Sequence, residues 1–202
     1  MRLKLLFAGL FVVLMSTGCH TILLKWYGFK DPDFESDASI REFQKQIGFE
    51  GFPYYGLKWE YWKQNKVFSV PDVFVFDNSG RYIPYKDSLK PNCNGPAELF
   101  LTELNTEKQY NYSDKYSLKS FIDYFEGQEC QPLIFEHNSK IDFYIFMTYT
   151  VFSGKKIFKE KSKIWLDSLQ NNKNIHYKLI MLNEDWKECW SAEQKQFFES
   201  GD

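Results

Sequence analysis

The sequence predicts an α/β fold in a single compact domain, and three segments in the last third of the chain carry this prediction. Residues 141–147 form a continuous apolar run, which is typical of a strand buried on both faces of a sheet. Residues 155–170 place apolar side chains at helical spacing with lysines outside them, and residues 175–182 form a second strand. A strand, a helix and a strand in this order normally form a parallel, right-handed unit.

Two elements are expected early in the chain. Asp37 can cap a helix over residues 38–47, and Gly48 would end it. The aromatic stretch 52–62 is interpreted as a packed loop and strand, because aromatic side chains bury large areas and dominate cores.

A hairpin and further helices are expected in the middle of the chain. Residues 66–76 are rich in β-forming residues, and Pro71 within them argues for an edge strand or a break. The turn sequence at 77–80 then leads into a second strand over 81–85. The remaining expectations are helices over 96–104 and 118–126, a polar loop over 105–114 and a short last helix over 192–198.

The composition is sufficient for a real core and argues against nucleic-acid binding. Of the 202 residues, 44% are apolar, and the formal net charge is −2 with no basic cluster that stands out. Aromatic residues reach 19%. They could stack on sugars or peptides, but codon bias explains them better, since Lys and the residues Phe, Tyr, Asn and Ile are all common.

The first nineteen residues have the pattern of an export signal. Arg2 and Lys4 precede an apolar run over 5–15, and residues 16–18 are small or polar and lead into Cys19. With a cysteine at that point, the chain resembles bacterial lipoprotein precursors, in which a peptidase cuts before the cysteine and lipid is attached to its thiol and new amine.

The lipoprotein resemblance covers only the start of the chain and departs from the family at Ser16, where leucine is usual. It implies a signal peptide over 1–18, an anchor-proximal segment over 19–36 and an α/β domain over 37–202. It also implies lipidation of Cys19, with the bilayer as a partner.

An uncleaved anchor is the alternative, since residues 5–24 are about long enough to span a membrane. Either arrangement places the domain outside the cytoplasm, in the cell envelope, with the positive flank left inside.

Three further cysteines could form one disulfide in an oxidising compartment. Cys93 and Cys130 both lie in turn-like sequences, so this pair is the expected bond, with Cys189 left over.

Residues 141–186 resemble the opening of thioredoxin-like domains, in which an apolar strand, a loop, a long helix and a second strand follow one another. In that family a Cys-x-x-Cys pair stands where the loop meets the helix, and a cis-proline precedes a later strand. Residues 151–154 contain no sulfur, and the only proline strand, at 70–76, lies upstream. The resemblance therefore implies a degenerate or permuted member without dithiol redox activity.

Ligands of open α/β sheets bind at the carboxyl ends of the strands. The loops expected to face a ligand therefore contain Thr148, Ser153 and Gly154 after the first strand, and Asn183 and Asp185 after the second. Glu184 and Asp185 are expected to form a solvated turn, and Trp186 and Trp190 to cover the end of the sheet.

No motif predicts catalysis, a metal or a cofactor. His20, His137 and His176 lack the spacing of metal ligands, and there is no nucleophile elbow or phosphate-binding glycine loop. The sequence therefore predicts a membrane-anchored lipoprotein with a binding or structural role. The alternatives are a degenerate thioredoxin-like protein that holds client proteins, and an enzyme whose site has no recognisable motif.

Overall fold

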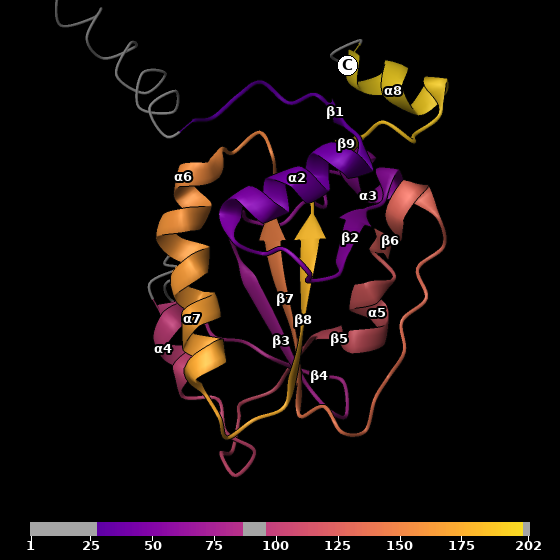
Figure 1. The fold of residues 1–202 in the computed structure, drawn as a ribbon. Coiled ribbons are helices and arrows are strands. Elements are labelled where there is room, and N and C mark those ends of the chain that lie inside the picture. Colours follow the sequence, from indigo (N-terminus) through magenta and orange to yellow (C-terminus); the bar gives the residue numbers. More distant parts are fainter. Residues whose placement is uncertain (1–27, 87–95, 200–202) are drawn as a thin grey trace, which may run out of the picture.

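A seven-stranded mixed sheet forms the centre of the computed structural model, which describes residues 28–86 and 96–199 (Figure 1). This confirms the predicted α/β class. In sheet order the strands are β5 (Ser113–Ser117), β4 (Arg81–Ile83), β3 (Val73–Asp77), β7 (Phe143–Tyr149), β8 (Tyr177–Asn183), β2 (Tyr54–Leu57) and β6 (Phe125–Glu126).

Helices cover both faces of the sheet. The described helical elements are α2 (Asp37–Ile47), α3 (Trp59–Lys63), α4 (Pro96–Thr102), α5 (Leu118–Ile122), η1 (Gln128–Cys130), α6 (Lys155–Ile157), η2 (Phe158–Ser162), α7 (Lys163–Asn171) and α8 (Ala192–Glu199). A small parallel pair, β1 (Phe34–Glu35) and β9 (Trp186–Lys187), lies apart from the main sheet and was not predicted.

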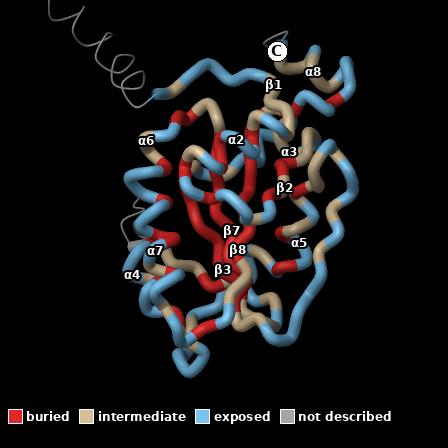
Figure 2. Tube along the Cα trace, viewed as in Figure 1, coloured by how far each residue is buried: buried red, intermediate tan, exposed pale blue. Residues whose placement is uncertain are grey.

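The predicted strand–helix–strand unit is present. β7 and β8 pair in parallel over seven residue pairs, from Phe143 with Tyr177 to Tyr149 with Asn183. β3 pairs with the other edge of β7 in the antiparallel direction and returns through a hairpin into β4. All seven residues of β7 are buried, as expected for a continuous apolar strand between two neighbours (Figure 2).

Alternation along these strands builds two cores. Residues of one set, which includes Ile145 and Met147, pack with helices α2, α4 and α7. Residues of the other set, which includes Phe146 and Ile180, pack with α5 and a group of aromatic rings around Phe121. Many of the aromatic side chains therefore belong to the two cores or pack against them.

The helix expected over 38–47 is α2, but its cap is Ser36 and not Asp37. The Ser36 hydroxyl accepts a hydrogen bond from the Ser39 amide, and Gly48 ends the helix with a positive φ of 87°. The Asp37 side chain is free for other contacts because it lies one position inside the helix.

The helix expected over 155–170 extends from α6 through the π-helical η2 to α7. Ile157, Phe158, Ser162 and Lys163 all keep right-handed helical backbone angles, so the three elements form one continuous helix. Its buried face contains Phe158, together with Trp165, Leu166 and Leu169.

Several predicted bounds were wrong. The strand expected over 66–76 begins only at Val73, because the Val70–Pro71 peptide bond is cis and the chain before it is irregular. The helix expected over 118–126 ends at Ile122 and is followed by β6. The polar loop expected to reach residue 114 ends where β5 begins, at Ser113. β5 is an edge strand whose sequence has no apolar pattern that would predict a strand. The stretch 52–62 contains α3 as well as β2.

α8 confirms the predicted last helix and rests on the domain through aromatic contacts. The Phe198 ring lies 4.7 Å from that of Trp186, 5.5 Å from that of Trp190 and 6.0 Å from that of Trp62, between centroids. Trp186 and Trp190 thus pack beneath this helix at one end of the molecule (Figure 1).

The expected disulfide between Cys93 and Cys130 is wrong, because Cys130 is bonded to Cys189. The segment after β8 returns past η1 and brings the two Cα atoms to 5.9 Å. Cys93 and the lipidation candidate Cys19 both lie outside the described residues. Within the described residues, no helix is long and apolar enough to cross a membrane.

Replacing Cys130 and Cys189 together by serine should lower the free energy of unfolding by about 4 kcal/mol, the chain-entropy value for a closed loop of this length. The bond joins residues 59 apart. Urea unfolding of the oxidised protein measures the loss. Cys93→Ser is the matched control and should change nothing; an equal loss in Cys93→Ser and Cys130→Ser would instead support the Cys93–Cys130 bond.

Candidate functional site

The carboxyl ends of β7 and β8 lie at the same edge of the sheet because the two strands are parallel. The antiparallel β3 starts at this edge, so the segment that contains cis-Pro71 and Asp72 joins it. We call this region the carboxyl edge; it consists of residues 69–72, 148–154 and 183–185.

Asp185 holds the loop after β7 in place. Its carboxylate oxygens lie 2.7 and 3.0 Å from the amide nitrogen of Val151, which donates to them, and the Asn183 side-chain amide donates over 2.6 Å. Asp185 is only 1% exposed. Burial raises the pKa of its carboxyl to about 7, while the hydrogen bonds from Val151 and Asn183 act in the opposite direction.

Thr148 joins β7 to the segment with the cis peptide. Its hydroxyl donates to the Ser69 carbonyl over 2.7 Å and accepts from the Asp72 amide over 2.7 Å, and its own amide donates to the Asp72 carbonyl. The Asp72 carboxylate accepts hydrogen bonds from the Tyr85 hydroxyl and from Lys86. This corner is consequently cross-linked by polar contacts between distant parts of the sequence.

All five residues predicted to line ligand-facing loops lie at this edge. The structure buries all of them, and their exposed fractions include 1% for Thr148, 3% for Ser153 and 0% for Asn183. The Ser153 and Thr150 hydroxyls bond to each other, and Asn183 bonds to Asp185. These side chains therefore shape the edge from within and do not point into solvent.

The expectation that Glu184 and Asp185 form a solvated turn is wrong. Glu184 is 1% exposed, and its Oε2 accepts a hydrogen bond of 2.9 Å from the Phe68 amide. Its Oε1 has no hydrogen-bond partner among the described residues. Burial raises the pKa of Glu184 well above its usual value. The irregular chain around Phe68 covers this carboxyl. Because Phe68 is distant in the sequence, the local pattern around Glu184 could not predict this burial.

A groove with a volume of about 600 Å³ opens beside the carboxyl edge, between α2 and the start of α6. Phe43 and Val151 contribute apolar surface, and Lys30, Glu42 and Lys155 contribute charges. Gly154 also lines the groove, with a positive φ of 75° that favours glycine where the loop enters the helix. Among the five predicted residues, only Gly154 borders this groove.

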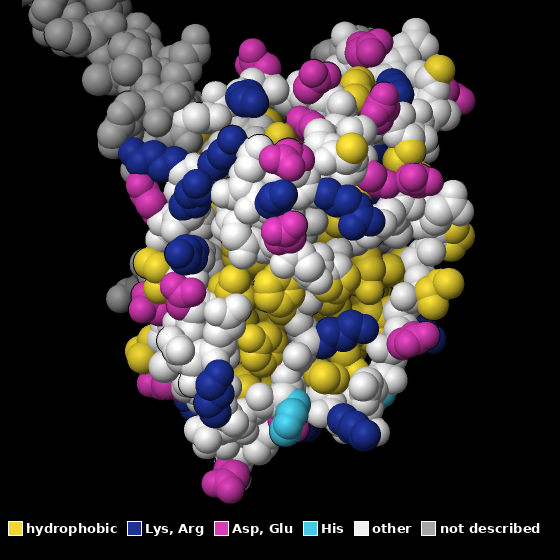
Figure 3. Space-filling view, in the orientation of Figure 1, with side chains coloured by type: hydrophobic (Ala, Val, Ile, Leu, Met, Phe, Trp, Pro, Cys, Tyr) yellow, Lys and Arg dark blue, Asp and Glu magenta, His cyan; other side chains and the backbone are white. Residues whose placement is uncertain are grey.

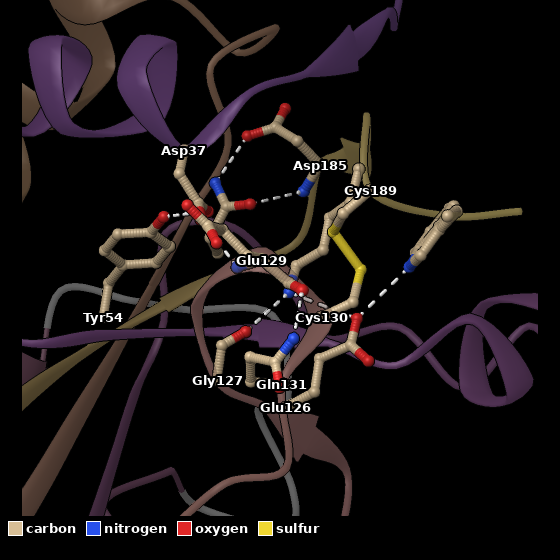
Figure 4. A network of polar contacts seen from close by, with 12 residues as sticks. Asp37, Tyr54, Glu126, Gly127, Glu129, Cys130, Gln131, Asp185 and Cys189 are labelled. Atoms are coloured by element: carbon tan, nitrogen blue, oxygen red, sulfur yellow. Dashed lines mark hydrogen bonds and ion pairs between the residues drawn. A yellow bond between two sulfur atoms is a disulfide. The ribbon is translucent and has the colours of Figure 1, made fainter.

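A second polar cluster surrounds the disulfide (Figure 4). Lys187 is 1% exposed, and its Nζ lies 3.2 Å from Glu126 Oε1 and 3.3 Å from the Gly127 carbonyl oxygen. Burial lowers the pKa of Lys187, and the charge of Glu126 opposes that shift. Gly56 leaves the space for this side chain, since a Cβ there would lie 1.9 Å from Lys187 Cε.

Asp37 extends this cluster toward α2. It accepts hydrogen bonds from the Tyr54 hydroxyl and, over 2.6 Å, from the Glu129 amide (Figure 4). Burial and Asp37 both raise the pKa of Tyr54. The cluster ties α2, β2 and η1 together beside the Cys130–Cys189 bond. Each of these contacts joins segments of the fold, which is a structural role.

The other sequence candidates do not form a site. His137 Nε2 lies 2.7 Å from the Asn78 carbonyl oxygen. His176, the residue before β8 in the sequence, lies beside Asp142. Within residues 28–86 and 96–199, no group of three or more His, Cys, Asp or Glu side chains could hold a metal ion.

Comparisons with known proteins add no family to this picture. No protein-family model matches the chain, and no match was found among curated proteins or solved structures. The fold and the site define it as an α/β domain with a groove at the carboxyl edge of a mixed sheet.

Glu184→Gln should remove part of the pH dependence of stability. A buried carboxyl with a raised pKa stabilises the fold in its protonated form. Its contribution is fully present below the pKa of glutamate in the unfolded chain and is lost as the pH rises through the raised pKa of the folded protein. Glutamine is neutral throughout and keeps an acceptor for the Phe68 amide. We expect urea midpoints that are similar to wild type at pH 4.5 and higher than wild type at pH 8.

The exposed Glu193 on α8 provides a matched control, since Glu193→Gln should follow the wild-type profile at both pH values. A Glu184→Gln profile that parallels wild type would contradict the assignment of a neutral Glu184.

Proposed function

We propose that this chain is a lipid-anchored protein of the bacterial cell envelope whose domain is a circularly permuted, thioredoxin-like scaffold. The scaffold binds a partner at the groove beside its carboxyl edge and carries out no dithiol exchange. The export pattern ending at Cys19 supports the anchoring, and the arrangement of the central strands supports the scaffold.

The strand order supports the permuted thioredoxin-like scaffold. The order β4-β3-β7-β8 combines the parallel strand–helix–strand unit with an antiparallel hairpin next to its first strand. Pro71 follows a cis peptide bond just before β3, as the resemblance requires of a proline facing the loop after β7. The hairpin precedes the unit in the sequence, which corresponds to a permuted order.

One observation carries the proposed binding role: the loop that would hold the redox cysteines is fastened by Asp185. Residues 151–154 are Val-Phe-Ser-Gly, and the amides of Val151 and Phe152 both point to the Asp185 carboxylate. Dithiol exchange requires a low-pKa thiolate at this position with a second thiol nearby. A loop held rigid by a buried carboxylate instead favours a fixed binding surface.

Lipidation is tested by Cys19→Ala in the native host. The lipoprotein peptidase requires the cysteine, so the variant should accumulate as an unprocessed precursor of higher mass, as should wild type under globomycin treatment. Mobility on a gel and the mass of the N-terminal peptide report the result. Wild type whose mobility is unchanged by the inhibitor would contradict lipidation and favour the uncleaved anchor.

Absence of dithiol exchange is tested by insulin reduction. The wild-type protein should leave the rate with dithiothreitol at its background value, because the loop after β7 offers no thiolate. Thioredoxin in the same assay is the positive control. A rate well above background that disappears in Cys130→Ser would show that the disulfide exchanges, and would overturn the non-redox proposal.

A further inference from the structure

The helix that starts beside the groove has an unusual distribution of charge. Residues 155–163 contain five lysines and one acidic residue, Glu160, whereas residues 164–171 contain no basic residue. Figure 3 shows dark-blue side chains over the side of the molecule formed by α6 and α7. Positive charge is therefore concentrated at the N-terminal end of this helix.

This placement does not serve the helix itself. Cations stabilise a helix within its last turn and are unfavourable within its first turn. Lys155, Lys159, Lys161 and Lys163 are exposed, and none has an ion-pair partner among the described residues. Lys156 differs, since its Nζ lies 3.9 Å from Glu160 Oε1. Lys155 thus opposes the helix dipole, and all four lysines are exposed charges without an ion pair among the described residues.

The anchor-proximal segment passes beside these lysines at residues 28–30. The Lys30 amide donates a hydrogen bond of 2.8 Å to the Phe152 carbonyl, in the loop that leads into α6. Gly28 and Lys30 line the groove together with Gly154 and Lys155. Residues 28–30 are therefore attached to the start of the lysine-rich helix.

The length of the tether limits how far this surface can lie from a lipid on Cys19. Nine residues lead from Cys19 to Gly28 (28 − 19), and a fully extended chain of that length spans about 30 Å. The start of the lysine-rich helix, to which this tether is attached, can therefore reach the bilayer that holds the anchor, whereas α5 covers the opposite face of the sheet from α7.

We propose that the partner bound at the groove and the adjoining lysine surface, defined as Lys30, Lys155, Lys159 and Lys163, is the layer of anionic lipid headgroups around the anchor. This rests on the proposed lipid anchoring and names the partner of the proposed binding site. Each lysine near an anionic bilayer surface is attracted to the headgroups. The acyl chains hold the protein on the membrane, and the lysine surface sets its orientation.

The nearby acidic residues leave this surface positive. Glu42 borders the groove and keeps its negative charge, since the Gln46 side chain that donates to it is neutral, while Lys30, Lys155 and Lys156 border the same groove. Glu160 lies beside Lys156. Asp31 and Asp33 follow Lys30 on the exposed segment that leads away toward β1. The charges that face the start of the helix are thus mainly lysines.

Amine labelling of the full-length acylated protein in vesicles tests the proposal. An acylating reagent is added to protein in phosphatidylcholine vesicles and in vesicles that also contain phosphatidylglycerol, and labelling at each lysine is followed by mass spectrometry. Labelling of the lysine surface should be about fivefold slower with phosphatidylglycerol, the factor that corresponds to roughly 1 kcal/mol. High salt should remove the difference, because it screens exposed charges.

The exposed Lys119 and Lys140 serve as internal controls and should label equally in both kinds of vesicle. Lys159→Glu combined with Lys163→Glu should abolish the protection of Lys30 and Lys155, whereas Lys119→Glu combined with Lys140→Glu should preserve it. Equal labelling of the lysine surface in the two vesicles, or equal protection of the control lysines, would overturn the proposal.

The peptides analysed by mass spectrometry in this experiment also distinguish failure of this inference from failure of the proposed anchoring. The mass of the N-terminal peptide shows whether Cys19 carries lipid. An acylated Cys19 with no selective protection refutes the lysine surface alone, whereas an unmodified Cys19 refutes the proposed anchoring.

Discussion

The pairing of β7 with strands on both of its edges is the constraint on which the rest of the structure depends. Parallel pairing with β8 and antiparallel pairing with β3 satisfy its backbone, and every side chain on it is buried. Side chains of alternating residues feed two separate cores, so each face of the sheet needs its own helical cover. The parallel direction of β8 also decides where a site can lie, since it brings two strand ends and the start of β3 to one edge.

At that edge the polar side chains are buried, whereas in many α/β sites the polar side chains at the strand ends face solvent. Asp185 holds the amides of the loop after β7, and Thr148 holds the segment around the cis peptide. Their hydrogen-bonding capacity is used within the protein. The groups left at the surface beside this edge are the groove between α2 and α6 and the lysines that surround its rim. The proposed binding role rests on this arrangement of a groove and surrounding charges.

Prediction from sequence succeeded where the signal was local and failed where it depended on partners distant in the chain. The apolar run of β7, the capped helix α2 and the last helix α8 were all anticipated, since periodicity and end signals lie within each segment. Two adjacent acidic residues after a strand have the local pattern of an exposed turn. Only the folded chain reveals that the Phe68 and Val151 amides meet Glu184 and Asp185. The Cys130–Cys189 bond was missed for the same reason, because spacing does not encode which loops meet.

The sequence by itself determined the α/β class, the strand–helix–strand unit and the lysine-rich start of the long helix, because these follow from composition and periodicity over short windows. The tertiary structure alone decided the order of the strands, the pairing of the cysteines and the burial of the polar carboxyl edge. It also attached the segment at Lys30 to the loop before α6. Those features arise from contacts between residues tens of positions apart, whose free energy depends on packing in three dimensions and not on local pattern.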